Sequence, residues 1–180
     1  MKELSLNVLD IAENSVKARA TLISIEVLED AESLTLTINN DGCGMKEEML
    51  RSVIDPFCTT RTTRKVGLGI PLLKMAAEQT GGYVTITSRH ESEYPDTHGT
   101  CVTAVFYKQH IDFTPMGDII STLTTLIQGS PTIDFVFRHG MADRTVALDT
   151  REMREILGAE IPLNDPEILR WIAQCLKEQY

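Results

Sequence analysis

The chain has 180 residues, of which 42% are hydrophobic and 24% charged, and its formal net charge is −9 at pH 7. This length suits one main buried core, and no apolar run approaches the ~20 residues that cross a bilayer. The negative charge disfavours a nucleic-acid partner, and the N-terminus does not resemble a secretory signal. We therefore expect a cytoplasmic protein that contacts neither nucleic acid nor membrane. Its four scattered cysteines are expected to be reduced thiols.

Hydrophobic spacing predicts the elements of the N-terminal half in turn. Near-helical spacing over residues 3–18 indicates a buried first helix, and two alternating segments around a polar turn indicate a hairpin. Two more helices and two more strands should follow. Together they predict an α+β fold, a two-layer sandwich with helices on one face of a mixed or mostly antiparallel sheet. The ranges after the first helix are 22–28, 33–40, 46–54, 70–79, 83–89 and 99–108.

The pattern changes after residue 108. A helix beginning at Pro115 is expected, followed by an apolar strand over 133–139 and further short elements to the end of the chain. We therefore divide the chain into a domain over 1–109 and a small C-terminal α/β extension over 110–180, whose role is unknown. The extension either completes the core or forms a partner surface. Core completion is favoured, because little sequence precedes the first helix to supply another strand.

Three polar residues are spaced along the predicted first helix. Asp10 and Asn14 lie one turn apart on one face, and Lys17 is within reach of that face. A carboxylate there can orient a water molecule, an amide oxygen can ligate magnesium, and an ammonium group can meet a phosphate. Taken alone, the pattern is more often a solvated helix surface.

Glycines mark two further motifs. Gly42 and Gly44, within the segment 40–45 that ends at Met45, permit close backbone approach to a flat ligand, although a plain tight turn explains them about as well. The segment 55–70 is rich in Thr and Arg, and its Gly67, Leu68 and Gly69 lead into a helix start, which is a typical anion site. A fourth short motif, Gly99 and Thr100, has no meaning alone.

The ordered set of four motifs resembles the GHKL, or Bergerat-fold, ATP-binding superfamily over roughly residues 3–107. ENSVKARATLISIEV and LTLTINNDGCGM are similar to MutL-type ATPases, and DPFCTTR with GLGIPLLKMAAEQTGG is similar to histidine kinases. The resemblance implies the Bergerat fold, with ATP and Mg²⁺ as cofactors. Asn14 would hold the metal, Lys17 a phosphate, and Thr100 would bond near the base. The cofactor-binding residues that it implies are Asn14, Lys17, Asn40, Gly42, Gly44, Met45, Arg61, Lys65, Gly67, Leu68, Gly69 and Thr100.

Departures from the family pattern are informative. Asn40 stands where the family has the Asp that accepts the adenine amine; its carbonyl still accepts, so adenine stays plausible while base selectivity is weakened. Asp10 stands where hydrolytic members have the catalytic Glu, and the shorter side chain implies slow turnover. Arg61 occupies the place of a kinase Lys in a short ATP lid over 59–66. Lys65 replaces a kinase Gly and either contacts a γ-phosphate or is solvated.

Three functions remain open. The favoured one is a histidine-kinase-like ATP-binding module that acts on a protein partner, similar to anti-sigma-factor serine kinases. The others are a slow Mg-dependent ATPase switch of MutL type without DNA, and an ATP sensor without catalysis. No phosphoacceptor His precedes the domain, and His110 is expected to be a linker residue, so a self-contained sensor kinase is not expected. His90, His98 and His139 are expected to be solvated. A homodimer is left open.

Overall fold

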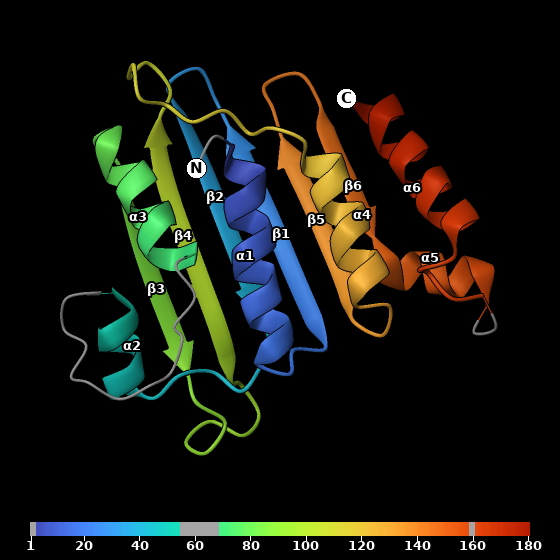
Figure 1. The fold of residues 1–180 in the computed structure, drawn as a ribbon, viewed down its shortest axis with the longest axis horizontal. Helices are drawn as coiled ribbons and strands as arrows, with labels where there is room; N and C mark the ends of the chain where they lie inside the picture. Colours follow the sequence, from blue (N-terminus) through green and yellow to red (C-terminus); the bar gives the residue numbers. More distant parts are fainter. Residues whose placement is uncertain (1–2, 55–68, 159–160) are drawn as a thin grey trace.

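The computed structural model describes residues 3–54, 69–158 and 161–180. Six strands form one sheet, and helices pack in a layer over it (Figure 1). The strands are β1 (Leu22–Glu29), β2 (Ser33–Asn40), β3 (Tyr83–Arg89), β4 (Gly99–Tyr107), β5 (Asp134–Gly140) and β6 (Thr145–Asp149). The helices are α1 (Leu4–Lys17), α2 (Glu47–Ile54), α3 (Gly69–Gln79), α4 (Ile119–Gly129), α5 (Thr150–Leu157) and α6 (Pro166–Gln179).

The strand order across the sheet is β3-β4-β2-β1-β5-β6. β1 and β5 run parallel, and the other neighbouring pairs are antiparallel. The predicted α+β sandwich with a mixed sheet is therefore confirmed. The predicted domain boundary at residues 109 and 110 falls between β4 and α4, and strands from both sides of it share this sheet. Within the described ranges, no helix is both long and apolar enough to cross a bilayer.

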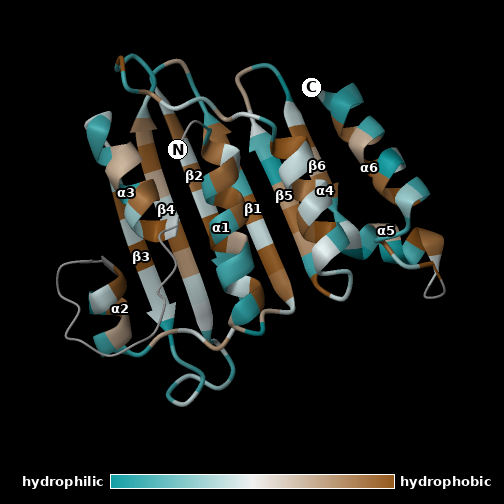
Figure 2. Ribbon diagram, in the orientation of Figure 1, coloured by the Kyte–Doolittle hydropathy of each residue, from teal (hydrophilic) through white to brown (hydrophobic). Residues whose placement is uncertain are grey.

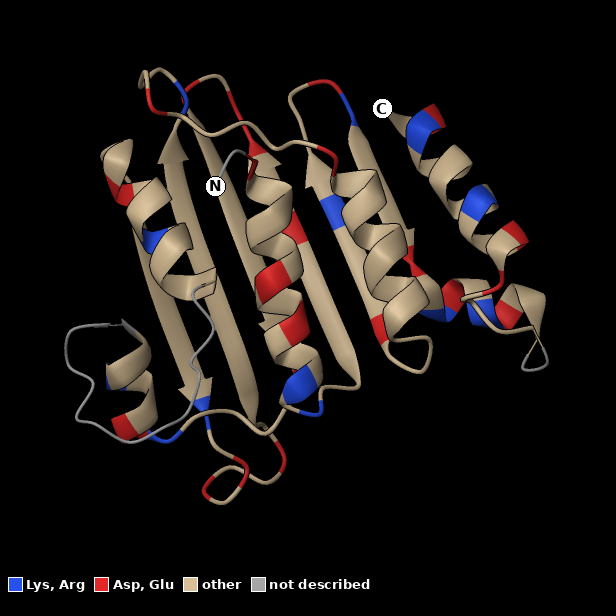
Figure 3. Cartoon of the chain, viewed as in Figure 1, with Lys and Arg blue, Asp and Glu red and all other residues tan. Residues whose placement is uncertain are grey.

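The core lies between the sheet and the layer that contains α1, α3 and α4. Side chains along the central strands alternate between this buried face and a more open one, visible as banding in Figure 2. Charged residues are concentrated on the helices and loops, and the strands carry few of them (Figure 3). The buried positions of the central hairpin are Ile23, Ile25 and Val27 on β1 and Leu34, Leu36 and Ile38 on β2. This alternation is the pattern that predicted the hairpin.

The C-terminal region completes this core. β5 extends the sheet directly beside β1, with Ile23 paired to Phe135 and Ile25 paired to Phe137. Both phenylalanines are buried, and so is Leu123 of α4, which belongs to the same hydrophobic cluster. The preference for core completion over a separate partner surface is thus confirmed.

The start of α4 differs from its prediction. The helix begins at Ile119, four residues after Pro115. Gly117 has a φ of 75°, which ends any regular helix there, and the Asp118 side chain caps the new one by accepting from the Ser121 N–H at 2.9 Å. The prediction from Pro115 was wrong because an N-cap Asp after a left-handed Gly outweighs the preference of proline for a first turn.

The segment before α4 has another role, at the N-terminus of α1. The N–H of Leu4 donates to the Pro115 carbonyl at 2.9 Å, and the N–H of Ser5 donates to the Met116 carbonyl at 2.8 Å. The first N–H groups of a helix have no partner within the helix. The extended segment therefore provides acceptors that a helix through Pro115 would have used internally.

Candidate functional site

α1 and the start of α3 meet at Asp10. Gly69 is the first residue of α3, and a Cβ atom placed on it would lie only 2.9 Å from the Asp10 Cβ. Only a glycine allows the two helices to approach this closely. Asp10 and Asn14 are partly exposed one turn apart, so two motifs that are far apart in the sequence are brought together here.

Asn7 lies one turn before Asp10 on α1 and is fully buried. Neither its side-chain oxygen nor its nitrogen has a hydrogen-bond partner within the part of the chain that the structure describes. A buried amide left in this way costs about 1–3 kcal/mol. Among the described residues, α1 therefore carries a buried amide without a hydrogen-bond partner one turn before Asp10.

Asn40 connects the end of β2 to α1. Its Nδ2 donates to the Ser15 hydroxyl at 2.9 Å, and its Oδ1 accepts from the Gly42 N–H at 3.0 Å. Ser15 is buried and donates in turn to the Ile11 carbonyl at 3.1 Å. These bonds fix the Asn40 amide on the helix-covered face of the sheet, next to the residue that follows Asn14.

A row of polar side chains continues from Asn40 across the strand ends. Asn40 pairs with Thr100 on β4, and Thr100 pairs with Ser88 on β3. The Ser88 hydroxyl lies 2.8 Å from the Thr100 hydroxyl and accepts from the Met45 N–H at 2.8 Å. One step further along the same face lies an apolar row of Ile38, Val102 and Ile86. These two rows form one surface, the strand-end floor, which is polar at the strand ends and apolar behind them. Such a surface suits a flat ring with a hydrogen-bonding edge.

Asp41 anchors the loop that follows β2. Its carboxylate accepts from the Thr21 N–H at 2.7 Å, the Thr21 hydroxyl at 2.5 Å and the Leu22 N–H at 2.9 Å. Burial alone would raise the pKa of Asp41, but these hydrogen bonds outweigh it and hold the pKa below the usual 3.8. Hydrogen bonds within the protein therefore occupy the Asp41 carboxylate. Of the neighbours Asn40 and Asp41, Asn40 is the one available to a ligand.

Both glycines of the loop are required by the protein's own backbone. A Cβ on Gly42 would lie 2.8 Å from the Ala18 carbonyl oxygen. Gly44 has a φ of 68°, and a Cβ there would lie 1.9 Å from the Arg89 carbonyl oxygen. His98 is partly buried, contrary to its expected solvation, and its Nδ1 donates to the Gly42 carbonyl at 2.7 Å. The loop is fixed on both sides, whether or not a ligand contacts it.

Lys17 is the predicted residue that the described structure does not join to this cluster. Lys17 is exposed and lines a groove of about 240 Å³ towards α4, together with Leu9 and Glu13, so the structure does not group it with Gly69. Four predicted cofactor-binding residues lie outside the described ranges: Arg61, Lys65, Gly67 and Leu68.

Sequence reasoning missed three residues that organise the site: Ser15, Asp41 and Ser88. Ser88 had a usable signal, because it continues the inward alternation of Val84 and Ile86 and is therefore a polar residue at an inward-facing strand position. Ser15 and Asp41 had none, since their partners become visible only when α1 and the start of β1 are placed against the end of β2.

This arrangement of motifs is accompanied by a family match. Residues 2–110 match the family described as histidine kinase-, DNA gyrase B-, and HSP90-like ATPase. The chain belongs to this family, and the resemblance drawn from its four motifs is confirmed.

Individual relatives agree with the family. A stretch of 65 residues is 32% identical to the sensor histidine kinase CssS of Bacillus subtilis (strain 168), covering 36% of this chain and 14% of that protein. The ATPase domain of Aquifex aeolicus MutL, complexed with ADP, has a similar fold, with a TM-score of 0.57, 11% identity and coverage of 97% of this chain and 88% of that one. The N-terminal domain of a DNA repair protein also has a similar fold, with a TM-score of 0.51 and 17% identity. The match covers 88% of this chain and 58% of that one.

Replacing Asp41 tests whether its carboxylate anchors the loop that follows β2. In Asp41→Asn one acceptor oxygen is lost, so we expect the free energy of unfolding at pH 7 to fall by about 1–3 kcal/mol. The folded pKa of Asp41 is lowered, so its contribution is present above the unfolded value of 3.8 and is lost as the pH falls towards the folded one. The difference from wild type should therefore shrink below pH 3.8. Denaturant unfolding of the variant and the wild type, at pH 7 and below pH 3.8, measures this difference in stability.

Asp96→Asn is the matched control, because Asp96 is exposed and no hydrogen bond holds its carboxylate in the described structure. It should leave stability unchanged within about 0.5 kcal/mol. Equal stability of both variants at pH 7 would show that Asp41 is not an anchor.

Proposed function

We propose that this chain binds ATP with Mg²⁺ where α1, the start of α3, the end of β2 and the start of β4 meet, and that it uses the nucleotide to act on a protein partner. The observation that carries the proposal is the contact between the motifs. Gly69 lies against Asp10, Asn40 is bonded to the residue after Asn14, and Thr100 pairs with Asn40. A single ligand at this place would touch all of them.

The adenine ring would occupy the strand-end floor. An adenine amine needs an acceptor, and the Asn40 Oδ1 has a second lone pair beyond the one used by Gly42. The Thr100 hydroxyl lies beside it, and the apolar row behind provides a surface for the ring. The fold shared with an ADP-bound MutL domain supports an adenine nucleotide.

The phosphates would lie along α1 towards α3. The N–H groups at the start of the 11-residue α3 and its dipole favour an anion at Gly69. Mg²⁺ is commonly held by one or two protein oxygens together with phosphates and water, so the amide oxygen of Asn14 suffices on the protein side. Asp10 lies where its carboxylate could orient a water molecule, although with slow turnover because it is one methylene shorter than Glu.

A kinase module is favoured over the alternatives. The similarity to a sensor histidine kinase supports transfer to a protein, and Asp10 disfavours fast hydrolysis. A slow MutL-like switch without DNA is the second candidate, favoured by the fold match along nearly the whole chain. The proposal includes that the protein is cytoplasmic and that it acts on another protein.

Asn14→Ala tests whether Asn14 holds the magnesium ion in the proposed site. Calorimetric titration with ATP, ADP and GTP, with and without Mg²⁺, should show magnesium-dependent ATP binding by the wild type. The variant should lose the magnesium-dependent part and bind at least about tenfold more weakly, because a charge-assisted ligand contact is removed. Asn39→Ala, on the opposite face of β2, should bind as wild type does. Absence of any nucleotide binding by the wild type would refute the proposal.

Asn40→Asp tests whether Asn40 contacts the adenine ring in the proposed site. A carboxylate can only accept, so it should favour the amine of adenine and repel the carbonyl of guanine. We expect the ratio of the dissociation constants for GTP and ATP to rise about tenfold, which corresponds to one hydrogen bond. The Ser15 hydroxyl can turn its single proton from the Ile11 carbonyl to the new oxygen, so folding should be retained. An unchanged ratio would place the base elsewhere.

Asp10→Ala distinguishes the candidate functions. In an ATPase switch it should leave ATP affinity within about twofold and reduce phosphate release on the order of a hundredfold or more. In a kinase, γ-labelled phosphate should appear on a co-purified protein with wild type and not with the variant. Nucleotide binding with neither activity, in the wild type, would favour the ATP sensor.

A further inference from the structure

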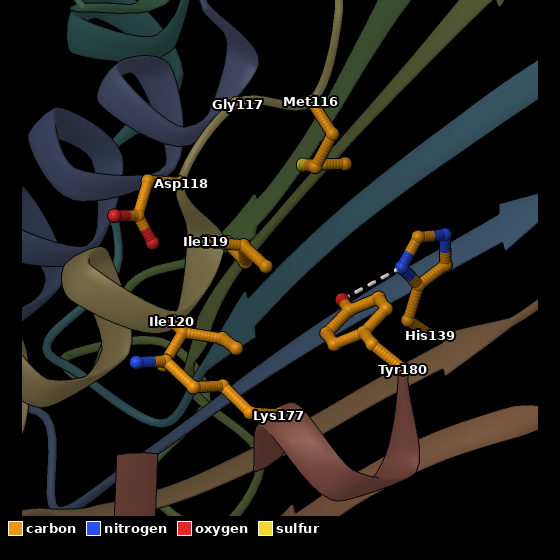
Figure 4. A pocket seen from close by; sticks show the side chains of 8 residues that line it. All are labelled: Met116, Gly117, Asp118, Ile119, Ile120, His139, Lys177 and Tyr180. Carbon is orange, nitrogen blue, oxygen red and sulfur yellow. Dashed lines mark hydrogen bonds between the residues drawn. The ribbon is translucent and has the colours of Figure 1, made fainter. Parts of the chain in front are cut away.

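A cavity lies at the opposite end of the sheet from the strand-end floor. It has a volume of about 310 Å³, is open to solvent, and is lined by the start of α4, the end of β5 and the last turn of α6 (Figure 4). One wall is apolar and consists of Met116, Ile119 and Ile120. The polar side chains around it are Asp118, Lys177 and Tyr180. Its volume is at the lower end of the ~300–1,000 Å³ typical of small-molecule sites.

A buried histidine closes the back of this cavity. His139 is only 4% exposed, so its predicted solvation was wrong. Its Nδ1 lies 2.9 Å from the Tyr180 hydroxyl, and its Nε2 lies 3.1 Å from Glu29 Oε2. Lys108 Nζ lies 2.6 Å from the other oxygen of Glu29. A hydrogen-bonded chain thus runs from the partly exposed Lys108 and Glu29 through the buried His139 to Tyr180.

The direction of these hydrogen bonds follows from the charges. Burial alone would raise the pKa of Glu29, but bonds from Lys108 and His139 outweigh it and lower the pKa, so Glu29 is an ionised acceptor. His139 therefore donates to it from Nε2. Burial, aided by the charge of Glu29, raises the pKa of Tyr180 to about 12, so its phenol keeps its proton. The Tyr180 hydroxyl shares a hydrogen bond with His139 Nδ1, and its oxygen keeps a lone pair that can accept from a ligand in the cavity.

The other two polar groups carry opposite charges. Asp118 uses Oδ1 to cap α4 through Ser121, which leaves Oδ2 as an acceptor beside the cavity. Lys177 is an exposed ammonium on α6 with three donors. The cavity therefore has two acceptors, one cation and an apolar wall.

We propose that this cavity binds a free apolar α-amino acid. The ammonium group is taken by Tyr180 and Asp118, the carboxylate by Lys177, and the side chain by the apolar wall. An amine without a carboxylate would leave Lys177 unmatched, and a carboxylate without an amine would face two acceptors. The zwitterion of an amino acid with an apolar side chain matches all the groups.

Titration with L-leucine, followed by calorimetry and by NMR of the protein, tests the proposal. Three probes each remove one feature: isoamylamine lacks the carboxylate, 4-methylpentanoate lacks the amine, and glycine lacks the apolar side chain. We expect L-leucine to bind at one site and each probe to bind at least about tenfold more weakly. No saturable binding of L-leucine, or equal binding of isoamylamine, would overturn the proposal.

Substitutions in the cavity locate the site. Tyr180→Phe removes the acceptor while keeping the ring, and Asp118→Asn removes the charge while keeping a capping side chain. Each should weaken L-leucine binding at least about tenfold. Arg170→Gln, at the other end of α6, should leave it unchanged. Binding that is insensitive to both cavity variants, with circular dichroism as in wild type, would overturn the assignment.

Discussion

The packing of α1 on the sheet is the contact on which the rest of the molecule depends. Leu4 and Val8 are fully buried and Ile11 is 3% exposed, and together they fix the rotation of the helix about its axis. Asp10 then meets the start of α3, and Asn14 lies one turn further along the same face of α1. A shift of one residue in this packing would turn the helix by about 100° and move Asp10 away from Gly69. The candidate nucleotide site is therefore a consequence of the core.

Most of the fold could be predicted from the sequence because burial here follows simple periods. The β1 and β2 alternation and the helical spacing of α1 are strong enough to locate these elements within one or two residues. The start of α4 was not predictable in the same way. Pro115 is used as an acceptor for the N–H of Leu4, and that requirement arises from a segment far away in the sequence.

The two candidate sites differ in how visible they are from sequence. The nucleotide site depends on glycines and polar residues at local spacings, so Asn40 and Gly69 were identified without a structure. The cavity at His139 has no local pattern, since Glu29, His139 and Tyr180 come from three distant segments. Their meeting depends on β5 joining β1 in parallel and on α6 lying along β6, which no short motif encodes.

α1 also connects the two sites physically. Its first turn is bonded to the cavity wall, where Ser5 donates to the Met116 carbonyl and Glu3 accepts from the Asp118 N–H at 3.3 Å. Asn14 lies at its other end. A ligand that changed the wall by occupying the cavity would act on the helix that bears Asp10 and Asn14. Because coupling between two binding sites is reciprocal, nucleotide binding would then change the affinity of the cavity by the same factor, and a rigid α1 that keeps one position would give none.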